Sequence, residues 1–324
     1  MKIVSHRVIG IAYAVAVGFS AGAHGQSYPT KPIRMIVPFS AGGPTDAMAR
    51  DLAQRMAVEL GQPVVVENRP GAGGNLGAEL VAKALPDGYT LLFASNGPLA
   101  GNPSLYQNIA YDPIKSFSPI TGYAIIGNIL AVHPSFPVHN FTELLKRVKD
   151  EPGKYSYASG GSGTTQHFSG EMLKAMAGVQ ITHISYKGEG PAVLDTLGNQ
   201  VPMVFCSFQS CLPYIQAGKL VAVAVTSPKR NASLPETPAI AETFPGFDLR
   251  AWYGLVAPAR TPTPVIRKLN EVAVRIINTP EVTKKIVSYG GEPRPGSSEE
   301  FGDFIRAEKS KWERIVKTSG ATVD

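Results

Sequence analysis

Short apolar, β-branched runs alternate along the chain with segments whose apolar residues recur every three or four positions. Residues 45–60 carry an apolar residue at every fourth position before Gly61, and residues 164–177 do the same before Gly178. Both patterns predict an amphipathic helix that ends at a glycine. The predicted strands are 33–39, 64–66, 89–94, 129–132, 155–158, 181–186, 203–205, 220–226 and 252–256.

This alternation of strands and helices predicts an α/β fold with mostly parallel sheets covered by helices on both faces. The last quarter of the chain is predicted to be helical. Thr263 and Thr279 each stand as an N-cap before a proline, and Ser297 with Glu300 forms a capping-box pattern. We expect these helices to be scaffold.

The chain of 324 residues is long enough for about two domains. No glycine/serine-rich or proline-rich linker separates them, but residues 118–133 and 245–258 are extended stretches with single prolines and glycines. If both stretches cross between lobes, the first lobe is discontinuous, with residues 27–123 and 249–324, and the second lobe is 124–248. A hinge of two strands permits closure around a ligand.

Two glycine-rich turns each lead from a predicted strand directly into a helix. Such a turn presents backbone N–H groups at the positive end of a helix, where a carboxylate binds favourably. One turn on each lobe predicts a single anionic ligand held between the lobes. The first turn supplies the candidates Phe39, Ser40, Ala41, Gly42, Gly43 and Asp46, and the second supplies Ser162, Gly163, Thr164, Thr165 and His167.

Each turn also has an alternative interpretation. The first could be an ordinary tight turn between a strand and a helix, and the hydroxyls of the second could simply cap the helix. Ser95 and Asn96 follow a predicted strand and could add an amide to the site. Lys187 ends another strand and could face an anion, although a lysine there is more often exposed.

Cys206 and Cys211 are the only cysteines of the chain. In an oxidising compartment they could form a disulfide across four intervening residues, and otherwise they would be two buried thiols. Cys206 is also a candidate ligand contact. No histidine or further cysteine lies at metal-ligand spacing, so we expect neither a metal nor a cofactor.

The N-terminus has the layout of a secretory signal, with Lys2 and Arg7 before an apolar run at 8–19 and small residues at 20–23. A cleavable signal over residues 1–25 predicts export to the periplasm, and an uncleaved membrane anchor is the alternative. Apolar residues make up 44% of the chain and charged residues 17%, which indicates a folded protein. The net charge of +6 is scattered, without basic runs among aromatics, so a nucleic-acid partner is not expected.

Catalytic motifs are largely missing from the sequence. The one G-x-S-x-G pattern, at 18–22, lies inside the predicted signal, and no H-E-x-x-H or Walker motif occurs. This favours a binding protein that is not an enzyme. The alternative is an exported hydrolase that uses the same cleft, with His167 as base and Ser162 or Thr164 as nucleophile.

A set of motifs, in one order over essentially the whole mature chain, resembles the Bug, or tripartite tricarboxylate transporter receptor, family of periplasmic solute-binding proteins. The motifs are Pro38-Phe39 with Gly42-Gly43 and Asp46, residues 66–74, residues 86–91, Gly163-Thr164 with His167, Tyr186-Lys187-Gly188, residues 218–220, residues 224–227 and Trp252-Tyr253-Gly254.

The resemblance implies a two-lobed periplasmic-binding-protein fold of the Venus flytrap type, type II. It implies capture of a small carboxylate through backbone amides and ordered water from both lobes, and delivery to a membrane permease or a sensor. It places Phe39, Ala41, Gly42 and Asp46 on one lobe, and Ser162, Thr164, Thr165 and His167 on the other. A monomer is the simplest expectation for such a receptor.

One position departs from the family pattern. Members commonly carry an acid after the phenylalanine of the strand that here ends at Phe205, and this chain has Cys206 there. An acid would favour ligands with an amino or hydroxyl donor, so its loss makes an amino-acid ligand less favoured. Dicarboxylates, tricarboxylates, aromatic acids and nicotinate-like compounds remain as candidate ligands.

Overall fold

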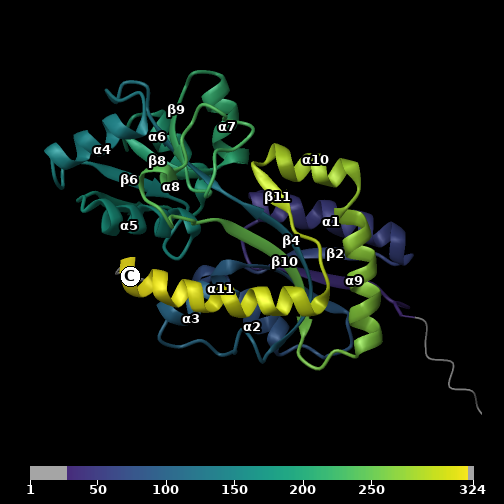
Figure 1. Ribbon diagram of the computed structural model, residues 1–324. Helices are drawn as coiled ribbons and strands as arrows, with labels where there is room; N and C mark the ends of the chain where they lie inside the picture. The colour runs from purple at the N-terminus through teal and green to yellow at the C-terminus, as the bar shows by residue number, and fades with distance from the viewer. Residues whose placement is uncertain (1–27, 320–324) are drawn as a thin grey trace, which may run out of the picture.

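The computed structural model describes residues 28–319, which form two lobes, each built around its own β-sheet (Figure 1). The first sheet has the strand order β11-β4-β10-β3-β1-β2 and the second has the order β7-β6-β8-β5-β9. The strands of the first sheet are β1 (Ile33–Val37), β2 (Val64–Asn68), β3 (Thr90–Ser95), β4 (Phe117–Ile126), β10 (Ala251–Pro258) and β11 (Gly291–Pro293). Those of the second are β5 (Asn128–Val132), β6 (Ser156–Ser159), β7 (Thr182–Ser185), β8 (Met203–Ser207) and β9 (Val221–Val225).

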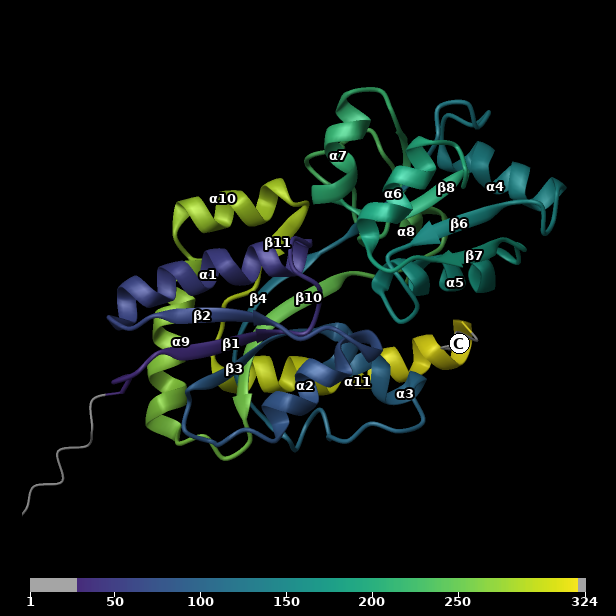
Figure 2. The same ribbon diagram turned by 180° about the vertical axis from the view of Figure 1, so that it is seen from behind.

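Helices flank both sheets, as the view from behind also shows (Figure 2). In the first lobe they are α1 (Pro44–Leu60), η1 (Ala72–Gly74), α2 (Asn75–Ala82), η2 (Gly97–Gly101), α3 (Asn102–Leu105), α9 (Thr263–Ile277), α10 (Pro280–Ser288) and α11 (Ser298–Ser319). In the second lobe they are α4 (Phe141–Asp150), α5 (Thr165–Ala177), α6 (Glu189–Leu197), α7 (Phe208–Gln216) and α8 (Ile240–Thr243). The predicted two-lobed α/β architecture is confirmed.

Each of the predicted strands matches an observed strand to within two residues at either end. The sequence analysis missed β4, where Pro119 and Gly122 interrupt the apolar pattern, and β11, which has only three residues. The C-terminal helices begin as predicted, with one correction. Helix α9 starts at Thr263 itself, and Pro262, with a φ of −55° and a ψ of 137°, is its N-cap residue.

The sheets are mixed, so the prediction of mostly parallel sheets was wrong. Strand β10 is antiparallel to both β3 and β4, and β5 is antiparallel to both β8 and β9. The parallel pairs, β1 with β2 and β3, and β6 with β7 and β8, are those whose strands are joined through helices. The antiparallel pairs involve β4, β5, β9 and β10, the strands next to the two chain crossings between the sheets.

The chain passes from the first sheet to the second between Ile126 and Asn128, and it returns between Val225 and Ala251. The two crossings are bonded to each other. The backbone N–H of Asn128 donates to Thr226 Oγ1 at 2.8 Å, and the N–H of Thr226 donates to the carbonyl of Asn128 at 2.9 Å. Both crossings therefore lie side by side in one narrow connection.

Helix α11 extends from the first lobe onto the second (Figure 1). Near its C-terminal end, Trp312 packs edge-on against Phe168 of α5 with a ring-centroid distance of 4.9 Å, and neither side chain is exposed. A single cluster of buried apolar residues includes both rings and continues into each lobe. The lobes therefore share part of their hydrophobic core.

The predicted signal segment, residues 1–25, lies outside the described residues. Between residues 28 and 319, no helix combines the length and the apolar character that a membrane span requires.

Candidate functional site

The first glycine-rich turn connects β1 to α1 and exposes Ser40, Ala41 and Gly42. Gly42 has a φ of +83°, in the left-handed region that favours glycine. Helix α1 follows Gly43, and no side chain caps its first turn. The first-turn N–H groups of α1 thus lack a side-chain acceptor, which suits this helix end to an anion.

Asp46 holds this turn in shape. Its Oδ2 accepts hydrogen bonds from the Gly42 N–H and from Arg50 Nε, both at 2.9 Å, and its Oδ1 accepts from Asn68 Nδ2 at 2.8 Å. Burial opposes ionisation of Asp46, but these donors outweigh it and hold the pKa of its carboxyl below the usual range. Asp46 is only 4% exposed, so it positions the loop instead of offering its carboxylate to a ligand.

The second glycine-rich turn, which connects β6 to α5, is bonded internally. The N–H of Ser162 donates to Ser185 Oγ at 3.0 Å, and the N–H of Gly163 donates to His167 Nδ1 at 3.2 Å. Thr164 caps α5, because its Oγ1 accepts from the His167 N–H at 3.3 Å. Two turns with similar sequences therefore differ: the amides of the second already have partners within the protein.

His167 is buried at 4% exposure and stacks on His183, with the ring centroids 4.3 Å apart. Because Nδ1 of His167 accepts a hydrogen bond from Gly163, the neutral ring carries its hydrogen on Nε2. The hydroxyl of Thr164 donates to the Gly161 carbonyl at 2.7 Å. Thr164 is thus held as a cap, which does not fit the role of a nucleophile activated by His167.

The remaining candidates fall in different environments. Ser95 and Asn96 are buried at the end of β3, where Ser95 pairs with Tyr253 of β10. Lys187 is exposed, and Thr165 Oγ1 accepts from Asn128 Nδ2 at 3.1 Å.

Cys206 and Cys211 form a disulfide with a Cα–Cα distance of 6.1 Å, and both residues are fully buried. The bond connects the end of β8 to α7. Cys206 therefore serves as a covalent tie at the strand end, and the alternative of two buried thiols does not describe the structure.

The sequence analysis did not select Glu189 or the side chain of Tyr253. The carboxylate of Glu189 accepts a hydrogen bond from the backbone N–H of Ser207, and Tyr253 is hydrogen-bonded to the Thr45 side chain. A glutamate at the first position of a helix has the ordinary signature of helix-dipole stabilisation, so its sequence context gave no functional signal.

The second turn touches the first lobe directly. A Cβ atom added to Gly163 would lie 3.3 Å from Leu105 Cδ2 and 3.5 Å from Asn102 Oδ1, both on α3. Asn102 is fully buried, and its Oδ1 has no hydrogen-bond partner among the described residues. The turn between β6 and α5 and the helix α3 thus form a close contact between the lobes.

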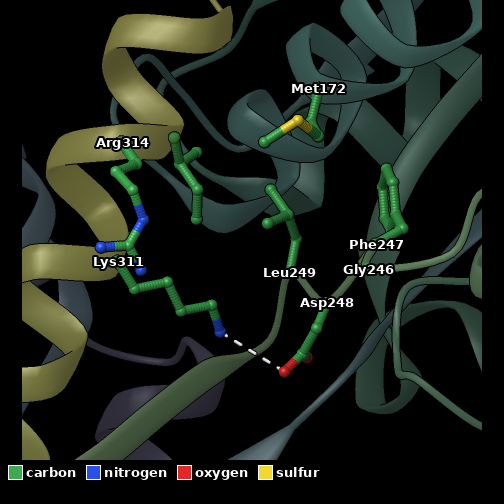
Figure 3. A pocket seen from close by; sticks show the side chains of 8 residues that line it. Met172, Gly246, Phe247, Asp248, Leu249, Lys311 and Arg314 are labelled. Atoms are coloured by element: carbon green, nitrogen blue, oxygen red, sulfur yellow. Dashed lines mark hydrogen bonds and ion pairs between the residues drawn. The ribbon is translucent and has the colours of Figure 1, made fainter.

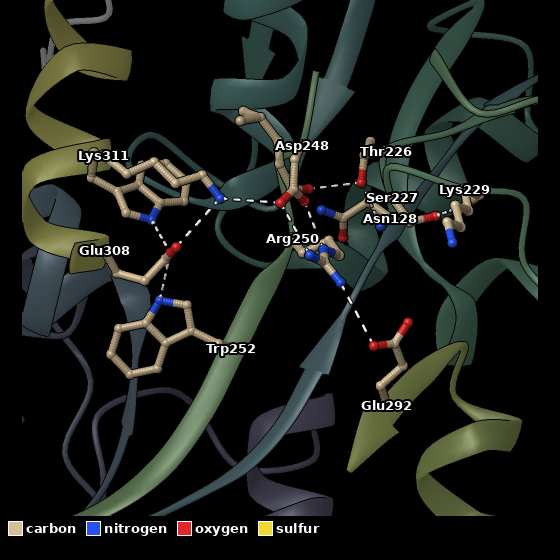
Figure 4. Close-up of polar contacts among 12 residues, drawn as sticks. Asn128, Thr226, Ser227, Lys229, Asp248, Arg250, Trp252, Glu292, Glu308 and Lys311 are labelled. Atoms are coloured by element: carbon tan, nitrogen blue, oxygen red, sulfur yellow. Dashed lines mark hydrogen bonds and ion pairs between the residues drawn. The ribbon is translucent and has the colours of Figure 1, made fainter. Parts of the chain in front are cut away.

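A network of charged residues surrounds the crossing that returns to β10 (Figure 4). Asp248 pairs with Arg250 at 2.6 Å and with Lys311 of α11 at 3.4 Å, while Glu308 accepts from the indole N–H groups of Trp252 and Trp312, both at 3.0 Å. Lys311 and Asp248 also line a pocket of about 250 Å³ beside α5 (Figure 3). Helix α11 is therefore bonded to the crossing strand itself.

Comparison with known proteins gives one consistent result. Residues 48–321 match the family described as the tripartite tricarboxylate transporter family receptor. Protein BugT of Bordetella pertussis is 35% identical over 316 residues, which cover 97% of each chain. A Pseudomonas protein encoded in the tcbD-tcbE intergenic region is 36% identical over 309 residues, covering 95% of this chain and 92% of the relative.

Solved structures agree with this match. A structure described as a periplasmic transporter has 43% identity and a TM-score of 0.85, and covers 92% of this chain and all of its own. A Rhodopseudomonas palustris protein with adipate has 34% identity, a TM-score of 0.86 and the same coverage. MatC of the same organism with bound malate has 32% identity and a TM-score of 0.81, and covers 89% of this chain and all of its own.

The matched family consists of receptors and is not a class of enzymes. The family match begins at residue 48, within α1, and spans both lobes and the second candidate turn. The alignment with BugT covers 97% of the chain, and the solved structures have the same fold. The chain therefore belongs to the Bug, or tripartite tricarboxylate transporter receptor, family of solute-binding proteins.

Proposed function

We propose that the protein is an exported receptor that captures a small organic carboxylate between its two lobes and delivers it to a tripartite-type permease or a sensor. The observation that carries the proposal is the first turn, where α1 begins without a side-chain cap next to an exposed, glycine-shaped loop. A carboxylate bound there accepts charge-assisted hydrogen bonds from backbone N–H groups. The relatives whose structures contain adipate and malate support the ligand class.

The two turns have different roles in this proposal. The first turn binds the carboxylate, with Phe39 and residues 40–43 around it. The second turn, whose amides are internally bonded, forms the opposite wall and presents its side chains, among them Ser162. The two lobes rotate about the paired crossings, which form the hinge that closure around a ligand requires. The first lobe is approximately residues 27–123 with 249–324, and the second is approximately 124–248.

Isothermal titration of the purified protein tests the ligand class directly. Succinate, malate, adipate, citrate, benzoate and an uncharged diol of similar size are compared, and each is also monitored for conversion. We expect saturable binding of at least one carboxylate with one site per chain, no binding of the diol and no product. Turnover of a bound compound, or binding of the diol alone, would contradict the proposal.

Export is tested separately by N-terminal sequencing of the protein recovered from the periplasmic fraction. A mature chain that begins near residue 26 supports cleavage of the predicted signal. Recovery of the intact N-terminus in the membrane fraction would instead support an uncleaved anchor.

A further inference from the structure

Glu189 lies between the second turn and the end of strand β8. It is the first residue of α6, and its carboxylate accepts a hydrogen bond from the backbone N–H of Ser207. A Cβ atom added to Gly160 would come between 3.2 and 3.5 Å from the N, Cα and Cβ atoms of Glu189. The absence of a side chain at position 160 thus leaves room for Glu189 beside the turn.

The carboxylate of Glu189 also lies close to the first lobe. Phe208, which directly follows Ser207, packs against Gly290 of the first lobe, because a Cβ atom added to Gly290 would lie 2.3 Å from Phe208 Cγ. Tyr253 of β10, on the same lobe, is near enough for the negative charge of Glu189 to act on its hydroxyl, and its side chain is hydrogen-bonded to Thr45 in the first turn of α1. Burial raises the pKa of Tyr253 to about 12, with the Glu189 charge acting in the same direction and the Thr45 hydrogen bond opposing it. Glu189 is therefore placed where the second lobe faces the proposed carboxylate-binding turn.

No positive charge compensates Glu189 within the described chain. Burial raises the pKa of the Glu189 carboxyl, and hydrogen-bond donors of Ser207 and Ser210 oppose this rise. No lysine, arginine or histidine contributes to the shift. Tyr253, the one titratable group found facing it, is neutral at physiological pH. A half-buried carboxylate without a cation is still costly, and a donor supplied by a ligand would reduce that cost.

We propose that Glu189 is a specificity-determining residue that accepts a hydrogen bond from an ammonium or hydroxyl group of the ligand. This inference rests on the proposed capture of a carboxylate by the first turn. The favoured ligand is then a small carboxylic acid that also carries a hydrogen-bond donor, such as an amino acid or a hydroxy acid. A donor-free dianion is disfavoured, because its second carboxylate would approach Glu189 without a proton between them.

This assignment changes the ligand class that was expected from the presence of Cys206 in place of an acid. The sequence analysis took the lack of an acid after Phe205 as a reason against amino-acid ligands. The structure brings the Glu189 carboxylate to Ser207, which directly follows Cys206, from a different element of the same lobe. An acid is therefore present next to this strand end, although the strand itself does not carry it.

Two series of matched ligands test the proposal by titration calorimetry at pH 7. One series is succinate, malate and aspartate, and the other is butyrate, 4-hydroxybutyrate and 4-aminobutyrate. Within each series the carbon skeleton is the same, and the three members carry no donor, a hydroxyl and an ammonium group, in that order. In at least one series, we expect a donor-bearing member to bind about tenfold or more tightly than the donor-free member. The relative affinities of the hydroxyl-bearing and ammonium-bearing members identify which donor the site prefers.

The Glu189→Gln variant isolates the carboxylate, because glutamine keeps an oxygen that can accept from the Ser207 N–H. We expect the variant to lose most of the preference for the donor-bearing ligand while its affinity for the donor-free member stays within about threefold. Glu236→Gln is the matched control, since Glu236 is an exposed glutamate of the same lobe. The melting temperature of each unliganded variant reports whether it is folded.

The outcomes separate the two proposals. Carboxylate binding with the same preferences in wild type and Glu189→Gln overturns the role of Glu189 but leaves carboxylate capture intact. Tightest binding of the donor-free members by the wild type overturns it as well, even if the Gln variant does not fold. If no member of either series binds the wild type, the role of Glu189 fails, and adipate, citrate and benzoate then decide whether carboxylate capture fails as well.

Discussion

At the scale of single residues, Asp46 has the clearest consequence for binding. Its three hydrogen bonds join the turn at Gly42 to Arg50 and Asn68. We expect Asp46→Asn to lower the free energy of unfolding by about 1–2 kcal/mol at pH 7 and to weaken carboxylate binding about tenfold. Denaturant titration and calorimetry measure the two effects.

The effect of Asp46 on stability should depend on pH. The folded-state pKa of its carboxyl is lowered, so the ionised form stabilises the fold above the unfolded-state pKa of about 3.9. This contribution is lost as the pH falls through the folded-state pKa. The difference in free energy of unfolding between the wild type and Asp46→Asn should therefore become smaller in that range. Asp303→Asn, which removes an exposed partner of Arg306, is the control. A pH-independent difference for Asp46→Asn would contradict this account.

The residue types identified the first turn, but they did not predict the hydrogen-bond partners of each side chain. Asp46 and His167 were selected from their positions near helix starts, and the structure shows both side chains bonded to their own turns. Glu189 was missed, because the elements that surround it are far apart in the sequence. Sequence patterns report local capping well, whereas the convergence of Glu189, Ser207 and Tyr253 arises only from tertiary packing.

At the scale of elements, the two glycines before α1 should behave differently. Gly42 has a φ of +83°, whereas Gly43 is extended with a φ of −82° and its nearest atom to an added Cβ is the Ser40 carbonyl oxygen at 3.7 Å. We expect Gly42→Ala to cost about 1–2 kcal/mol of stability and to weaken carboxylate binding, because alanine disfavours the left-handed conformation that shapes the turn.

Gly43→Ala is the matched control for this prediction and should change stability by less than about 0.5 kcal/mol. Thermal denaturation and titration with the same carboxylate measure both variants. Equal losses for the two substitutions would mean that the turn does not depend on the conformation of Gly42.

The positions of most strands could be predicted, because β-branched apolar runs are a local signal. Their directions could not. Whether β10 runs parallel or antiparallel to its neighbours depends on where the chain re-enters the first sheet after the second lobe. The residues of β10 themselves carry no local signal for that direction. β4 was missed for a related reason, since its ten residues include a proline and a glycine that only the sheet context accommodates.

At the scale of the whole molecule, the contact between α11 and α5 bears on how the lobes are coupled. Trp312 and Phe168 are fully buried against each other and belong to a cluster that extends into both lobes. We therefore expect the wild-type protein to unfold in one cooperative calorimetric transition, although each lobe has its own sheet. Trp312→Ala should lower stability by about 3–5 kcal/mol and separate the unfolding of the two lobes into two transitions.

Phe93→Ala provides the comparison that isolates coupling from loss of core volume. Phe93 is equally buried, but it packs on Tyr123 and Tyr253 within the first lobe. Its removal should cost a similar free energy while the transition stays single, because the contact between the lobes is intact. Two transitions in both variants would show that any large cavity uncouples the lobes. One transition in both would place the coupling elsewhere, with the charged network of Asp248 and Lys311 at the crossing as the next contact to remove.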